Sequence, residues 1–233
     1  MIQTIRPCHA KKFAGSVICS VNFINSTNKI GGFMMTTLFT DVSAWNEDSA
    51  LFFKQLATQN VKAAVVKITE GSADGTNYVN PKAASQITNA LNAGLQAHCY
   101  HFARFTSVQD AKNEATFFVQ HVKAFGMDPT TILVLDVEST DLTTNPQALT
   151  DQINAFMTVV KANGYPKCDI YASASWFNQP RFYREKLIPQ NCWVANYGRP
   201  QPDVETAGAW QFTDHWNDQN LDMSYDFNGF YTN

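Results

Sequence analysis

Two carboxylic acids, Asp136 and Glu138, close the segment ILVLDVES at residues 132–139. The apolar run before them predicts a strand buried on both faces, and carboxylates at its end cost desolvation energy unless they meet water, donors or a substrate. Residues two apart on a strand share one face, about 6.6 Å apart along it. Like charges this close raise the pKa of one partner, which can then stay protonated near neutral pH and act as a general acid. The pair therefore predicts acid catalysis, and cleavage of a glycosidic bond is the reaction that needs it.

Further acidic residues stand at the ends of other predicted strands. Asp41 ends the first, Glu70 the second and Asp226 the last. In barrels the carboxyl ends of the strands carry the active site, although a single strand-end Asp is as often a helix cap or turn former. If the strands follow one another around a closed barrel, Asp226 lies beside Asp41, across the mouth from Asp136. For Glu70, a role in substrate binding and a structural role as hydrogen-bond acceptor are equally compatible with the sequence.

The elements that must position these acids alternate between strand and helix from Thr37 onward. Five predicted strands, each followed by a predicted helix, precede three strand-like runs with no helices between them. The strands are 38–42, 61–69, 95–102, 131–137, 169–172, 192–197, 209–212 and 224–227, and the helices are 47–59 behind an Asn46 cap, 81–93, 107–125, 146–163 and a weaker one at 176–186. This order predicts an α/β fold, an irregular TIM-like barrel of five strand-helix units followed by three strands; the pattern alone also permits an open doubly wound sheet.

Composition excludes several classes of function. The chain of 233 residues is 45% hydrophobic and 16% charged, carries a net charge of −3 and has no basic run. We therefore expect a soluble globular protein that binds neither nucleic acid nor an anionic membrane. Five scattered cysteines specify neither a disulfide framework nor a zinc site. His98 and His101 point to opposite faces of one strand, so they cannot share a metal ion. We expect no metal and no cofactor.

The first 36 residues differ from the rest. A basic start precedes a semi-apolar stretch at 13–24 that polar residues interrupt, so residues 1–36 are interpreted as a leader outside the domain. A weak signal-like segment and an over-extended start remain alternatives. The predicted catalytic domain is 37–233.

Eight short motifs follow one another along that domain: TDVSAWN (40–46), VVKITEG (65–71), AGLQAHCYHFAR (93–104), LDVE (135–138), IYAS (170–173), WVANYG (193–198), WQFT (210–213) and YDFNGF (225–230). Together they resemble glycoside hydrolase family 25, the Chalaropsis-type lysozymes. The resemblance implies an N-acetylmuramidase that cleaves the β-1,4 bond between N-acetylmuramic acid and N-acetylglucosamine in peptidoglycan. It also implies a monomer that acts on glycan strands outside the cell or in the wall, either secreted or released by phage lysis.

By the same matching, Glu138 takes the acid position, Asp136 the adjacent carboxylate and Asp41 the strand-one aspartate. Asp226 is preferred to Asp222 for the final aspartate, because YDFNGF matches the family's pattern there. Residues expected in the substrate groove are Tyr100, Tyr171, Tyr197, Trp210 and Gln211, together with Glu70. Two other functions remain open: a catalytically inactive peptidoglycan-binding domain, and a phosphoester hydrolase that holds Mg²⁺ in the acidic cluster.

Overall fold

The computed structural model describes residues 36–233. The leader predicted at 1–36 lies outside these residues, apart from its last position. Within them, no helix is both long enough and apolar enough to cross a membrane.

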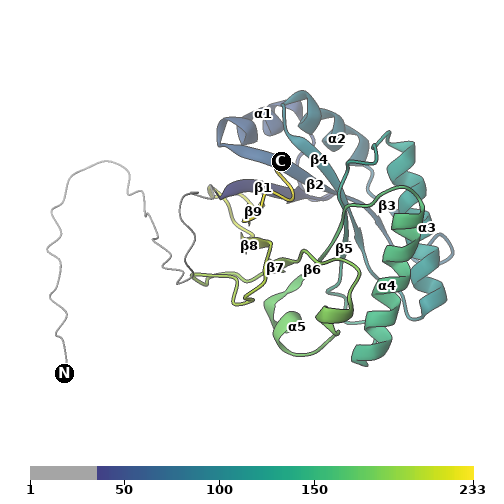
Figure 1. Cartoon of the computed structure of the whole chain (residues 1–233). Coiled ribbons are helices and arrows are strands. Elements are labelled where there is room, and N and C mark those ends of the chain that lie inside the picture. The colour runs from purple at the N-terminus through teal and green to yellow at the C-terminus, as the bar shows by residue number, and fades with distance from the viewer. Residues whose placement is uncertain (1–35) are drawn as a thin grey trace, which may run out of the picture. The chain divides into compact units, whose positions relative to one another are not determined.

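Eight strands close into a barrel, as predicted (Figure 1). They are β1 (Thr37–Val42), β2 (Val61–Glu70), β4 (Gln96–Phe102), β5 (Leu133–Asp136), β6 (Cys168–Ser173), β7 (Trp193–Ala195), β8 (Ala209–Thr213) and β9 (Asp222–Asp226). The order is β1-β9-β8-β7-β6-β5-β4-β2, and pairing of β1 with β2 closes the ring. A two-residue strand, β3 (Tyr78–Val79), pairs with the end of β2 outside the ring. Ring closure rules out the open doubly wound sheet.

The helices follow the first five barrel strands and cover the outside of the ring (Figure 1). They are α1 (Ala50–Thr58), α2 (Ala83–Asn92), α3 (Val108–Ala124), α4 (Pro146–Ala162) and the short α5 (Ala174–Asn178). Ser107 caps α3 by accepting a hydrogen bond from the Asp110 amide, and Asn145 caps α4 in the same way with Pro146 in its first turn. Side-chain caps thus fix where α3 and α4 begin.

Two helix predictions were wrong in their bounds. The first helix begins at Ala50 behind Ser49, whose side chain accepts from the Phe52 amide, whereas Asn46 Oδ1 accepts from the Ser43 amide in the preceding turn. The helix predicted at 176–186 is instead α5 and a single 3-10 turn, η1 (Arg184–Lys186). Between them lies Pro180, which has no amide hydrogen to continue the α5 ladder.

The last strand runs against its neighbours. β1, β2, β4, β5, β6, β7 and β8 are parallel, but β9 pairs antiparallel with both β8 and β1. Asp222, the first residue of β9, therefore lies opposite Asp41, and Asp226, its last residue, lies opposite Thr37. The start of β9 is at the mouth of the barrel and its end is at the bottom.

Alternation along the strands separates two apolar layers. Side chains inside the ring form one cluster: Phe39, Ala63, Val65, Ile132, Val134, Tyr171, Trp193, Ala209 and Tyr231. Residues of the opposite parity, such as Val66, Leu135 and Val194, pack outward in the larger cluster that includes the helices. The inward parity, continued toward the mouth, selects the side chains that line the site.

Candidate active site

A pocket of about 540 Å³ opens at the mouth of the barrel, at the carboxyl ends of the parallel strands. Four carboxylic acids, an amide and four aromatic side chains meet there. The lining residues are Asp41, Tyr100, Val134, Asp136, Glu138, Tyr171, Trp193, Tyr197, Gln211 and Asp222. The predicted convergence of acids from distant segments therefore occurs, with one change in membership.

Strand register explains why these residues converge. Asp136 lies between Phe102 on β4 and Tyr171 on β6, and Asp41 pairs with Asp222. Residues in register on neighbouring strands point to the same side of the sheet. Acids on β1, β5 and β9 consequently enter one space although they are far apart in sequence.

Asp136 and Glu138 differ in exposure. Asp136 is 7% exposed, and its Oδ1 accepts no hydrogen bond from any residue of the described part of the chain. Burial, and then the neighbouring Glu138, raises the pKa of Asp136 well above its usual range. Glu138 is the solvent-accessible residue of the two. Partial burial of its carboxyl still raises its pKa, and the charge of Lys67 opposes this rise. The more accessible acid is thus placed to donate a proton to a ligand, with a buried carboxyl beside it.

Asp41 and Asp222 form the second acidic pair. Gln211 Nε2 donates to Asp41 Oδ2 at 2.7 Å, and Gln211 Oε1 accepts from the hydroxyls of Tyr171, at 2.8 Å, and Tyr197. Because both tyrosines donate to the amide oxygen, the amide must turn its nitrogen toward Asp41. Burial, followed by the charge of Asp222, raises the pKa of Asp41, and burial, followed by Asp214 and Glu138, raises the pKa of Asp222 to about 6.

The expectation that Asp226 faces the groove is wrong in this structure. Its side chain is 1% exposed and accepts five hydrogen bonds, from the amides of Asn228, Gly229, Phe230 and Tyr231 and from the Thr232 hydroxyl. The cause is the antiparallel direction of β9, which carries Asp222 rather than Asp226 to the mouth. Asp226 instead holds the C-terminal segment against the barrel bottom, where Tyr231 stacks on Phe39 with ring centroids 4.5 Å apart.

Replacing Asp226 with alanine should therefore reduce stability rather than chemistry. Buried amides would lose their acceptor, and we expect the free energy of unfolding to fall by about 2–3 kcal/mol. Denaturant unfolding of D226A against D151A, a surface change on α4, measures this effect. Any catalytic activity per folded molecule should stay near the wild-type level. A large loss of activity without loss of stability would return Asp226 to the site.

The predicted groove residues divide into two groups. Tyr100, Tyr171, Tyr197 and Gln211 line the pocket. Trp210 does not: it lies on the outward face, where its Nε1 donates to the Asn196 carbonyl at 3.0 Å and its ring packs against Phe212 and Tyr225. Gln211 is the inward residue of β8, so its neighbour Trp210 points outward.

Glu70 lies outside the pocket lining and is an ion-pair acceptor. Its carboxylate contacts Lys67 Nζ at 2.8 Å and Arg104 Nη2 at 2.8 Å. The sequence did not single out Lys67 or Arg104. The signal for Lys67 was present, because Ala63, Val65 and Lys67 have the same parity on β2 and the first two point inward.

The two histidines of β4, His98 and His101, have structural partners. His98 Nδ1 accepts from the Ile132 amide at 3.3 Å, so its Nε2 donates to the Tyr231 carbonyl at 2.9 Å. His101 lies between the Thr69 hydroxyl and the Glu114 carboxylate, each 2.8 Å away. Within residues 36–233, no three His, Cys, Asp or Glu side chains are grouped in a way that could hold a metal ion.

A closed α/β barrel with paired carboxylic acids in a pocket at the carboxyl ends of its strands is an arrangement that glycoside hydrolases use. A family model described as Glycosyl hydrolases family 25 matches residues 40–221. The chain belongs to this family.

Individual relatives agree with that assignment. The chain is 28% identical over 185 residues to Lysozyme M1 of Streptomyces globisporus, a match that covers 74% of this chain and 59% of the relative. It is 27% identical to the bacterial lysozyme from Streptomyces coelicolor, with a TM-score of 0.68 over 83% of this chain and 92% of that one. It is also 27% identical to the modular Cpl-1 endolysin complexed with a peptidoglycan analogue, with a TM-score of 0.65 over 82% of this chain and 54% of that one. The chain thus spans about six tenths of the length of Lysozyme M1.

Proposed function

We propose that this chain is a peptidoglycan hydrolase, an N-acetylmuramidase that cleaves the β-1,4 bond between N-acetylmuramic acid and N-acetylglucosamine. The observation that carries the proposal is the pairing of Asp136 and Glu138 in one pocket at the mouth of a family 25 barrel. Relatives named lysozyme, and an endolysin solved with a peptidoglycan analogue, support the choice of substrate.

Glu138 is the proposed proton donor to the bridging oxygen. It is the solvent-accessible member of the pair, and burial raises its pKa, which favours the protonated form that a general acid needs. Asp136 stabilises the positive charge that develops at C1, either directly or through the 2-acetamido group of the substrate. Asp136 lines the pocket, and its Oδ1 accepts no hydrogen bond from residues 36–233, so no donor of the described chain competes with that charge for this oxygen.

Asp41 and Asp222 are proposed to position ring hydroxyls from the opposite side of the pocket. Gln211, fixed by Tyr171 and Tyr197, holds Asp41 in place. The exposed ring of Tyr197 and the pocket-lining Tyr100 offer surfaces for sugar rings. In this proposal Asp222 takes the position that the sequence assigned to Asp226.

The site of action that fits this substrate is the cell wall, reached by secretion or by release during phage lysis. We propose that the protein is a monomer. Its proposed partners are glycan strands, and neither nucleic acid nor a membrane. The net charge of −3 favours an uncharged or mixed surface over a polyanion as partner.

The test is to digest purified peptidoglycan, reduce the products with borohydride and identify the reduced sugar. Reduced N-acetylmuramic acid supports the proposal. Reduced N-acetylglucosamine would assign the chain to glucosaminidases instead, and binding without release of reducing ends would favour an inactive binding domain. Loss of hydrolysis in EDTA, restored by Mg²⁺, would favour the metal-dependent alternative.

A further inference from the structure

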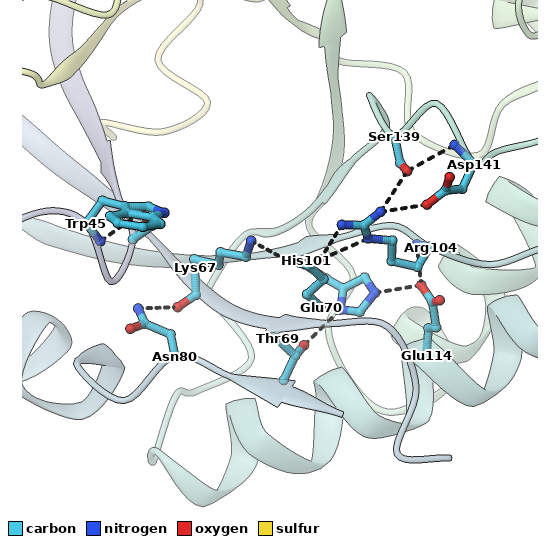
Figure 2. A network of polar contacts seen from close by, with 11 residues as sticks. Trp45, Lys67, Thr69, Glu70, Asn80, His101, Arg104, Glu114, Ser139 and Asp141 are labelled. Atoms are coloured by element: carbon cyan, nitrogen blue, oxygen red, sulfur yellow. Dashed lines mark hydrogen bonds and ion pairs between the residues drawn. The ribbon is translucent and has the colours of Figure 1, made fainter. Parts of the chain in front are cut away.

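A network of charged and polar side chains surrounds Glu70 (Figure 2). Glu70, at the end of β2, receives Lys67 Nζ at 2.8 Å on one carboxylate oxygen and Arg104 Nε at 2.9 Å on the other. The side chains of Lys67 and Glu70 are 14% and 16% exposed. One carboxylate therefore holds two cations close to the barrel mouth.

Lys67 belongs to the inward face of β2. It follows Ala63 and Val65 in parity and pairs in register with Tyr100, which lines the pocket. Its ammonium lies 4.7 Å from the ring centroid of Phe102, and Phe102 pairs in register with Asp136. The ammonium is consequently held beside Phe102, the β4 residue that pairs with Asp136, at the edge of the pocket lining.

Arg104 extends the network to the segment that follows Glu138. Its Nη1 contacts Asp141 Oδ2 at 2.6 Å and Ser139 Oγ at 3.4 Å, and the Asp141 amide donates to the same Ser139 hydroxyl. Ser139 is the residue after Glu138 and is 5% exposed. Figure 2 shows Arg104 between Glu70 and this segment.

The backbone of Arg104 is also held in place, by the buried carboxylate of Glu114. Its backbone amide donates to Glu114 Oε2 at 3.1 Å, and the same carboxylate oxygen contacts His101 Nε2. His101 in turn contacts Thr69, the residue before Glu70. The network thus joins the end of β2 to the segments after β4 and β5, and its Thr69–His101–Glu114 part is buried.

Lys67 is a cation close to a barrel mouth that is lined mainly by acidic groups. Besides Glu138, the titratable groups that line the mouth are carboxyls and phenols: Asp41 on β1, Tyr100 on β4, Asp136 on β5, Tyr171 on β6, Tyr197 after β7 and Asp222 on β9. Around the Lys67 ammonium itself are Glu70, the Arg104 guanidinium that shares Glu70, and the ring of Tyr78. Burial raises the pKa values of Asp136 and Glu138, and the charge of Lys67 opposes that rise at both. The charge of Lys67 therefore acts on both acids, although its direct ion pair is with Glu70.

We propose that Lys67 and Arg104, both held by Glu70, are positioning residues for the acid pair: Lys67 supplies its counter-charge, and Arg104 fixes the segment that carries Glu138. The effect of these residues on catalysis rests on the proposed hydrolase function. The clamp itself, meaning the contacts of Lys67 and Arg104 with Glu70 that set the proton affinity and placement of Glu138, does not depend on that function.

Lys67→Met keeps the apolar stem and removes the charge. The pKa of Glu138 should then rise by about one pH unit, because an opposite charge at close range favours the ionised acid. Since the general acid must be protonated, the alkaline limb of the pH profile of hydrolysis should move upward by the same amount. Lys67→Arg should restore the wild-type limb. Lys62→Met, an exposed position at the far end of the same strand, is the matched control.

The ¹³C signal of the Glu138 carboxyl, assigned by its absence in Glu138→Gln, reads this pKa without any substrate. An unchanged titration in K67M, in a protein that folds like the wild type, overturns the role of Lys67 whether or not the protein hydrolyses glycan. If the wild type releases no reducing ends but K67M still shifts the titration, the hydrolase proposal fails and the clamp stands.

Arg104→Gln tests the second arm. Loss of the contacts to Ser139 and Asp141 should lower kcat about tenfold or more with a smaller change in KM, and leave the alkaline limb nearer the wild-type position than K67M does. Arg104→Lys should recover part of the loss, and Arg199→Gln, an exposed change, should have no effect. Equal kcat in R104Q and wild type would remove Arg104 from the proposal.

Discussion

Glu138→Gln is expected to lower the rate of glycan hydrolysis by about 10²- to 10⁴-fold, because an amide cannot supply the proton that the leaving oxygen needs. Glutamine has nearly the same shape, and Glu138 is solvent-accessible, so the fold should be unaffected. The variant should still bind peptidoglycan fragments. Release of reducing ends, thermal unfolding and binding, measured on one preparation, separate these effects.

Glu205→Gln is the matched control for Glu138, since it makes the same chemical change at an exposed position outside the pocket. It should hydrolyse glycan at the wild-type rate. If E138Q retains wild-type activity, Glu138 is not the proton donor.

Asp136→Asn is expected to lower kcat by about 10²- to 10³-fold with little change in KM. The positive charge at C1 develops only in the transition state, so a residue that stabilises it contributes little to ground-state binding. Asparagine retains the shape of the side chain, which is 7% exposed, but cannot carry the negative charge. Steady-state kinetics on a soluble glycan fragment give the two constants.

Asp151→Asn, on the exposed face of α4, controls for the loss of one carboxylate charge. A D136N variant whose KM rises while kcat is unchanged would make Asp136 a binding residue only.

Much of this site follows from local sequence, because the chemistry lies on strands whose burial pattern is strong. The apolar run before Asp136 leaves little choice but a central strand, and the spacing to Glu138 then fixes a shared face. Asp41 follows from the same logic on the first strand. The caps Ser107 and Asn145 similarly fix two helix starts from local residues alone.

Strand direction is the part that the sequence could not supply. Short strands without helices between them can pair either way, and period-two alternation is identical in both directions. A reversed β9 exchanges the two ends of the strand, so that Asp222 enters the pocket and Asp226 anchors the C-terminal segment. The aromatic Trp210 was misplaced for a related reason, because aromatic type alone does not indicate which face of a strand a residue occupies.

Neither Lys67 nor Arg104 stands out in the sequence, because the role proposed for each depends on its neighbours. A lysine at a strand end is ordinarily a solvated charge. Its partner Glu70 is three residues away, but the arginine and the Ser139 segment follow other strands, and only the pairing of β2 with β4 and of β4 with β5 brings them together.

A crystal structure of the E138Q variant bound to a peptidoglycan tetrasaccharide tests the central assignment most directly. We predict the bridging oxygen within about 3 Å of the side-chain amide of residue 138, with the 2-acetamido group or C1 of the adjoining muramic acid facing Asp136 and ring hydroxyls toward Asp41 and Asp222. A sugar chain seated away from these side chains would contradict the account.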